Sequence, residues 1–128
     1  MIGFDLDDTL AAVEYELASQ RGLANVYRSA KLIYRPTEPF IIVTARPVKT
    51  TAERNATIEW CKENVPNYRG LYFVTGTESE IIQKKVGYIR SRNLTSWTDN
   101  NRDILAQMKE LTTVPLYWMK QDGTRERY

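Results

Sequence analysis

Two aspartates stand two residues apart near the start of the chain, at the end of an apolar run. Asp5 and Asp7 follow residues 2–4, Ile-Gly-Phe, and lead into Thr9 in the pattern Asp-x-Asp-x-Thr. Carboxylates repel one another, so they are brought together where a cation or a shared proton reduces that repulsion. Because oxygen ligands favour Mg²⁺, and because parallel-sheet enzymes hold ligands where strands end, the pair indicates metal-assisted chemistry.

The composition narrows that chemistry. The 128-residue chain has no histidine and a single cysteine, Cys61. This excludes Ser-His-Asp triads, Cys-His dyads, histidine-ligated zinc sites and a disulfide framework. Catalysis must therefore use carboxylates, Lys, Arg, Ser, Thr or Tyr. The net charge of +2 permits a polyanionic partner without requiring one.

The length and hydropathy pattern predict one domain over residues 1–128. No apolar stretch is long enough to cross a membrane, and a strand is expected from residue 2, which leaves no room for a signal peptide. We therefore expect a cytoplasmic protein without a membrane partner. Residues 120–128 are polar and are expected to form a frayed tail.

Apolar patterns predict strands alternating with helices. Strands are expected from residue 2 and at 40–43, 71–74, 94–98 and 114–119, the last at a sheet edge because of Pro115. Helices are expected at 23–34, 51–64, 78–91 and 101–111, the second opened by a capping box at Thr50 and Glu53. This order predicts a three-layer, Rossmann-like α/β fold with a parallel five-stranded sheet and helices on both faces. Residues 11–22 give no clear pattern.

Two further polar residues fall at predicted strand ends. Thr44 follows the strand at 40–43, and Asp99 follows the strand at 94–98. Since the carboxyl ends of parallel strands meet at one edge of a sheet, these residues are expected to share a site with Asp5 and Asp7. Arg46 comes two residues after Thr44, where its guanidinium could bind phosphate with two hydrogen bonds. An exposed surface position fits Arg46 equally well.

Two adjacent lysines compete as the cation of this site. The apolar arc of the helix expected over 78–91 consists of Ile81, Ile82, Val86 and Ile89. Lys85 lies within this arc and Lys84 lies outside it. A lysine on an apolar face needs an anionic partner, so Lys85 is favoured. The alternative is that Lys85 extends along the apolar surface to water.

The segment after the fourth strand offers the remaining acidic candidates. Asp99 could ligate a metal, and Asp103 could do so through a water molecule. Asn100 stands between them, where it can donate or accept a hydrogen bond but adds no charge. Asp103 also suits a purely structural role, because an acid in the first turn favours the helix dipole and Asn100 with Asp103 resembles a cap.

Taken in order, these segments resemble the four motifs of the haloacid dehalogenase (HAD) superfamily, most of whose members are phosphohydrolases. The resemblance implies a HAD-like fold in which Asp5 is the nucleophile and forms an aspartyl-phosphate intermediate. Asp7 would be the general acid and base, and its backbone carbonyl would reach Mg²⁺. The implied metal ligands are Asp5, Asp7 and Asp99, and the implied phosphate-binding residues are Thr9, Thr44, Arg46 and Lys85.

The chain departs from this superfamily in one motif and in size. The superfamily usually has Asp-Asp, or a second Asp four residues on, where this chain has Asp99-Asn100 with Asp103. The stretches between the motifs leave no room for a cap domain, so the site is expected to be open. Superfamily members without a cap often act on macromolecules or use a neighbouring subunit as a lid, so an oligomer is compatible with this sequence.

A closer resemblance is to the phosphatase domain of bacteriophage-type polynucleotide kinase, which removes a 3′-phosphate from a nucleic-acid end. It rests on residues 2–10 (IGFDLDDTL), 41–46 (IIVTAR) and 51–61 (TAERNATIEWC). No Gly-x-x-x-x-Gly-Lys-Ser/Thr run is present, so no kinase module is expected. The expected function is thus a Mg²⁺-dependent polynucleotide 3′-phosphatase. The alternatives are a 5′(3′)-nucleotidase or other small-molecule phosphatase and, third, a catalytically inactive binding protein.

Overall fold

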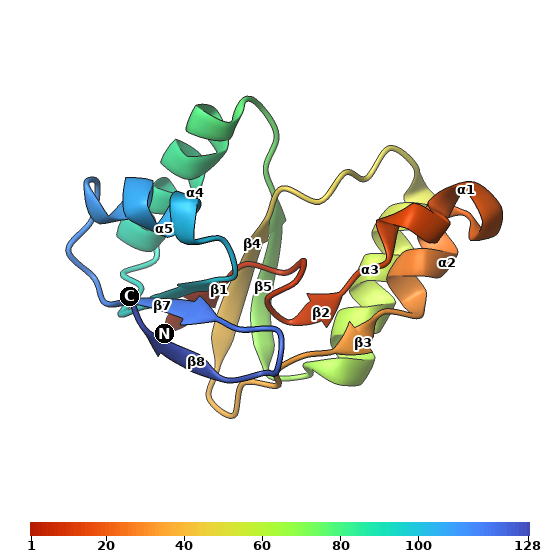
Figure 1. Cartoon of the computed structure of the whole chain (residues 1–128), viewed down its shortest axis with the longest axis horizontal. Coiled ribbons are helices and arrows are strands. Elements are labelled where there is room, and N and C mark those ends of the chain that lie inside the picture. Colours follow the sequence, from red (N-terminus) through yellow and green to blue (C-terminus); the bar gives the residue numbers. More distant parts are fainter.

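A six-stranded, mostly parallel sheet forms the centre of the molecule, which the computed structural model describes over residues 1–128 (Figure 1). The strands run in the order β5-β4-β1-β6-β7-β8. Their bounds are β1 Ile2–Phe4, β4 Phe40–Thr44, β5 Tyr68–Phe73, β6 Trp97–Asp99, β7 Leu116–Met119 and β8 Arg125–Arg127. The first five are parallel to their neighbours, and β8 is antiparallel to β7. The chain therefore adds strands first on one side of β1 and then on the other.

Helices cover both faces of this sheet. The helices predicted at 51–64 and 78–91 are confirmed as α3, Thr51–Asn64, and α4, Glu78–Ser91. The helix predicted at 101–111 is α5, Arg102–Lys109. Figure 1 shows α4 and α5 on one side of the sheet and α3 on the other. No helix combines the length and apolar character that a membrane crossing requires.

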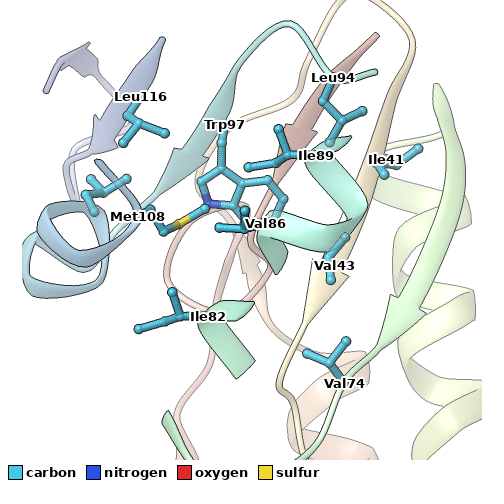
Figure 2. Close-up of a cluster of buried hydrophobic side chains, with 11 residues drawn as sticks. Ile41, Val43, Val74, Ile82, Val86, Ile89, Leu94, Trp97, Met108 and Leu116 are labelled. Carbon is cyan, nitrogen blue, oxygen red and sulfur yellow. The ribbon is translucent and has the colours of Figure 1, made fainter. Parts of the chain in front are cut away.

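The strand β4 shows why the two faces each need a core. Its residues are all buried, and alternate side chains point to opposite faces. Ile41 and Val43 join the cluster beneath α4 and α5, which also contains Trp97 (Figure 2). Phe40 and Ile42 join the second cluster, with Trp60 and Cys61 of α3. The continuous apolar run thus predicted a central strand correctly.

Local caps set where the helices begin. Thr77 and Glu80 form a reciprocal capping box at the start of α4. The box expected at Thr50 is only half formed, because the Glu53 carboxylate accepts a hydrogen bond from the Lys49 N–H instead. At α5 the cap is Asn101, whose side chain accepts from the N–H groups of the next turn, rather than the expected Asn100.

The expectation of a frayed tail and five strands was wrong. Residues 125–127 form β8, which pairs with β7, so β7 is not an edge strand. The turn between them contains Gly123 at φ +84°, a left-handed conformation that glycine adopts without strain. The Asp122 carboxylate accepts from the Thr124 N–H at 2.9 Å. This Asp-Gly turn was the sequence signal for a hairpin, and the polarity of the tail concealed it.

The helix predicted over 23–34 was also too long. The helix is α2, Leu23–Arg28, and Lys31–Leu32 form β3, which pairs antiparallel with β2, Ala11–Ala12. The ambiguous residues between β2 and α2 form a short 3₁₀ helix η1, Tyr15–Leu17, and α1, Ala18–Arg21. The β2–β3 pair closes this helical insertion at its base, a long-range contact that helical spacing alone does not reveal.

Candidate active site

The predicted site residues meet at the carboxyl ends of three adjacent strands. Asp5 follows β1, Thr44 ends β4 and Asp99 ends β6, and β1 lies between the other two strands. All three line a cavity of about 430 Å³. Because the connections run to opposite sides of β1, this is the switch point at which open parallel sheets leave a crevice for a ligand.

Lys85 joins two of these carboxylates. Its Nζ donates to Asp5 Oδ1 at 3.1 Å and to Asp99 Oδ2 at 3.3 Å, and its side chain is only 3% exposed. Lys84, by contrast, is exposed and donates to the carbonyl of Thr75. The helical arc that favoured Lys85 over Lys84 therefore predicted which lysine lies in the cavity.

The charges of Asp5, Asp99 and Lys85 do not cancel. Burial and, after it, the neighbouring charge of Asp99 raise the pKa of Asp5 to about 7, although Lys85 acts in the opposite direction. Burial alone would lower the pKa of Lys85, but the carboxylates of Asp5 and Asp99 raise it above its usual range. Lys85 thus stays protonated, and one cation does not fully offset two buried carboxylates.

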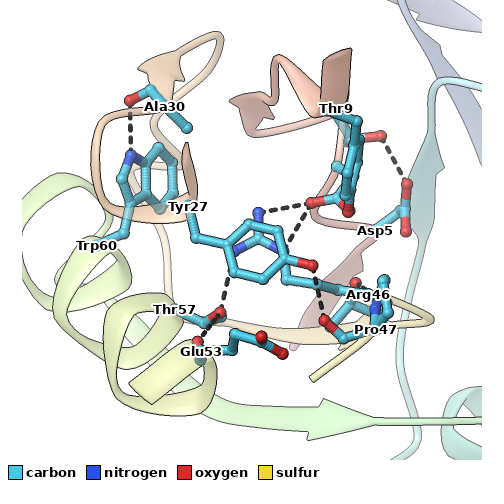
Figure 3. Close-up of polar contacts among 12 residues, drawn as sticks. Asp5, Thr9, Tyr27, Ala30, Arg46, Pro47, Glu53, Thr57 and Trp60 are labelled. Carbon is cyan, nitrogen blue, oxygen red and sulfur yellow. Dashed lines mark hydrogen bonds and ion pairs between the residues drawn. The ribbon is translucent and has the colours of Figure 1, made fainter. Parts of the chain in front are cut away.

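Asp7 occupies a different environment. The guanidinium of Arg46 donates to Asp7 Oδ1 from Nε, at 2.9 Å, and from a terminal nitrogen, at 2.5 Å. The hydroxyl of Tyr15 donates to Asp7 Oδ2. Arg46 is itself buried beneath the ring of Tyr27, 4.0 Å from the ring centroid, and donates to the Thr57 hydroxyl at 3.1 Å (Figure 3). The guanidinium expected at a phosphate is therefore paired with Asp7.

Three oxygens converge on the side-chain amide of Asn100. When its NH₂ group faces them, the nitrogen lies 3.2 Å from Asp5 Oδ2 and 3.3 Å from both the Asp7 carbonyl oxygen and Asp99 Oδ1. The amide has two hydrogens for these three acceptor oxygens, so one oxygen is left without a hydrogen from Asn100. Such an arrangement of oxygens, with two of them from carboxylates, is one that Mg²⁺ satisfies. These three oxygens are thus suitable ligands for a divalent cation.

This oxygen set does not include the Asp7 carboxylate. No group of three or more acidic, histidine or cysteine side chains is arranged to hold a metal ion. Asp7 is turned toward Arg46, so it offers its backbone carbonyl oxygen to the cluster. Asp103 is exposed and does not line the cavity. It lies in the first turn of α5, where an acid interacts favourably with the helix dipole.

Thr9 and Thr44 both form hydrogen bonds within the site. Thr9 is buried, and its hydroxyl donates to Asp5 Oδ2 at 3.2 Å, which holds the loop after β1 (Figure 3). The Thr44 hydroxyl oxygen accepts from the Arg46 N–H at 3.1 Å. Since this contact uses an acceptor position, the hydroxyl hydrogen of Thr44 can be donated to a ligand in the cavity.

Sequence reasoning missed two aromatic side chains in contact with the site carboxylates. Tyr15 lies in the segment that gave no clear pattern, so nothing in the sequence placed it beside Asp7. Trp97 donates its indole N–H to Asp99 Oδ2 at 3.3 Å. A signal for Trp97 was present, because residues two apart in a strand point to the same face. Cys61 is buried in the other core, and burial raises its pKa to about 12, so it is no nucleophile.

Comparison with protein-family models, with curated protein sequences and with solved structures returned no match. The arguments for function therefore depend on the geometry of this cavity and on the motifs of the sequence.

Proposed function

We propose that this protein is a HAD-type, Mg²⁺-dependent phosphomonoester hydrolase that acts through an aspartyl-phosphate on Asp5. One observation carries the proposal: two carboxylates, a backbone carbonyl and a buried lysine converge at the switch point of a parallel sheet. Burying Lys85 with two carboxylates costs desolvation free energy that their attraction offsets only in part. Charged groups with strongly perturbed pKa values in a cavity are typical of functional sites.

The residues that would hold Mg²⁺ are Asp5 and Asp99 through their carboxylates and Asp7 through its carbonyl. When bound, the ion supplies the positive charge that lets a carboxylate approach an anionic phosphate. Lys85 contributes a second positive charge from the opposite side of the Asp5 carboxylate, on Oδ1, whereas the oxygen cluster involves Oδ2.

Residues of the chain itself carry out the separate steps of the reaction. An oxygen of Asp5 attacks phosphorus as the bond to the leaving alcohol breaks, and Asp7 donates the proton that the alcohol takes. Asp7 next removes a proton from water, whose oxygen attacks the same phosphorus. The acyl-phosphate bond breaks, phosphate leaves and Asp5 is restored. The hydroxyl of Thr44 and the ammonium of Lys85 bind the phosphate oxygens.

Arg46 links phosphate binding to Asp7. Its guanidinium pairs with Asp7 Oδ1 and also lines the cavity. A substrate phosphate in the cavity gives Arg46 a second anionic partner and weakens its hold on Asp7. The Asp7 side chain can then turn toward the leaving alcohol and the attacking water.

We favour a polynucleotide 3′-phosphatase over a nucleotidase. The cavity is open, and the helical insertion at 13–30 packs α2 against α3 rather than forming a separate domain over the site. An open site suits the end of a long chain. Tyr15 favours the alternative, a small-molecule phosphatase, because it brings one partly exposed aromatic ring to the cavity rim.

Phosphate release in the presence of Mg²⁺ tests both readings. A 3′-phosphorylated oligonucleotide is compared with 3′- and 5′-mononucleotides, with Asp5→Asn as the control. We expect the oligonucleotide to be preferred and Asp5→Asn to show only background release. Preference for mononucleotides would establish the nucleotidase instead. Release that is unchanged in Asp5→Asn would refute the nucleophile and the proposed mechanism.

A further inference from the structure

Every oxygen of the Asp99 carboxylate has a defined partner. Oδ2 accepts from Lys85 Nζ at 3.3 Å and from the Trp97 indole N–H at 3.3 Å. Oδ1 accepts from the Asn101 N–H at 3.1 Å and faces the amide of Asn100. The partners on both oxygens thus fix the orientation in which Oδ1 points toward the oxygen cluster.

Trp97 is rigidly held. It is fully buried at the centre of the cluster beneath α4 and α5, among side chains that include Val86, Leu94 and Met108 (Figure 2). The neighbouring strand makes room for its ring: a Cβ on Gly3 would lie 2.8 Å from a ring carbon of Trp97. The ring also lies 5.5 Å from Lys85 Nζ. Any rotation of this indole would require the surrounding core to move.

We propose that Trp97 is a positioning residue, whose indole N–H holds Asp99 Oδ2 so that Oδ1 faces the Mg²⁺ position. This inference rests on the proposed function. Without the indole N–H, Lys85 alone would anchor Oδ2, and Lys85 also serves Asp5. The Asp99 carboxylate would keep the Lys85 contact on Oδ2 and the Asn101 N–H on Oδ1, but it would lose one of its three hydrogen bonds and would be held less firmly. Hydrogen-bonded partners of metal ligands commonly change metal affinity by about 10- to 100-fold.

The chain offers a matched control in Trp60. Its indole is 1% exposed and donates to the Ala30 carbonyl at 2.8 Å, on the other face of the sheet. Trp60→Phe and Trp97→Phe each remove one buried indole N–H and keep an aromatic ring. A role in core packing alone predicts similar effects of the two substitutions on Mg²⁺ binding.

The test measures Mg²⁺ affinity by calorimetric titration of the folded variants. We expect Trp97→Phe to weaken Mg²⁺ binding by about tenfold and Trp60→Phe to leave it unchanged. In turnover, Trp97→Phe should raise the Mg²⁺ concentration for half-maximal rate more than it lowers the rate at saturating Mg²⁺. Equal Mg²⁺ affinities in the two variants would overturn the inference while leaving the phosphatase proposal intact.

A second measurement avoids the risk that Trp97→Phe does not fold. In the unsubstituted protein, the indole N–H resonance of Trp97 should shift on Mg²⁺ addition, and that of Trp60 should not. The signals are assigned by elimination with Trp60→Phe and Trp118→Phe. Mg²⁺ binding without a shift at Trp97 would overturn the inference. A protein that neither binds Mg²⁺ nor releases phosphate would refute the proposed function, and this inference with it.

Discussion

Asp5 and Asp7 are two residues apart but lie in contrasting environments. Asp5 is buried beside a second carboxylate and shares one lysine with it, so burial raises its pKa to about 7. Asp7 has a side chain 20% exposed and has its own guanidinium and a tyrosine hydroxyl. Enzymes separate the roles of two carboxylates by such differences in surroundings. The contrast fits Asp5 as the group whose charge a metal ion would stabilise, whereas the proton-exchange role proposed for Asp7 rests on the sequence motif.

Removing Lys85 should affect the Asp5 environment most. Lys85→Ala leaves two buried carboxylates without a countercharge, so we expect a loss of about 3–5 kcal/mol in unfolding free energy near pH 8 and loss of turnover to background. Lys84→Ala is the matched control, because that side chain is exposed and contacts one carbonyl. Urea denaturation and phosphate release measure the two effects. Equal losses in both variants would show that Lys85 has no special role.

Removing the Asp7 carboxylate should affect proton transfer without removing the nucleophile. We expect Asp7→Asn to slow turnover by about 10²–10⁴-fold and to retain phosphate on Asp5, since water would no longer be deprotonated. Rapid-quench measurements would compare the initial release of alcohol with the later release of phosphate. If alcohol and phosphate appeared together at the wild-type rate, Asp7 would have no acid–base role.

A smaller change sharpens the role of Tyr15. Tyr15→Phe removes one hydrogen bond to Asp7 and keeps the pair with Arg46, so we expect kcat to fall about tenfold, as for a bond worth about 1.4 kcal/mol. Tyr34→Phe is the control, because Tyr34 stacks on Phe4 in the core. Thermal unfolding should show little change in either variant. An equal fall in kcat for Tyr34→Phe would contradict this role.

The last expected effect involves no turnover and concerns the pH dependence of stability without metal. The folded pKa of Asp5 lies above its ordinary 3.8, so the unfolded chain loses this proton first. The free energy of unfolding should therefore fall as pH rises from about 4 to about 7 and then level off. Asp5→Asn should lack this fall. Unfolding of both proteins in EDTA measures it, and parallel curves for the two would contradict the raised pKa.

Several elements were predictable because their signals are local. Helix α4 has a capping box at its start and an apolar arc that places Lys85 inward. The run at 40–43 is apolar on both faces and became the fully buried β4. By contrast, helix α2 was predicted too long, because the β2–β3 pairing interrupts a spacing that otherwise suits a helix. Local helix propensity is overridden where a distant strand offers backbone hydrogen bonds.

The sequence alone determined the α/β alternation and placed Asp5, Thr44 and Asp99 at strand ends. Hydrophobic periodicity, and the capping and turn residues that begin and end each element, are properties of neighbouring residues. Only the tertiary structure decided their partners. Arg46 reaches Asp7 across 39 positions, and Lys85 reaches Asp5 across 80. Such contacts depend on how strands order themselves around β1 and on which side chains the two cores bury. The electrostatic contrast between Asp5 and Asp7 is therefore a product of packing.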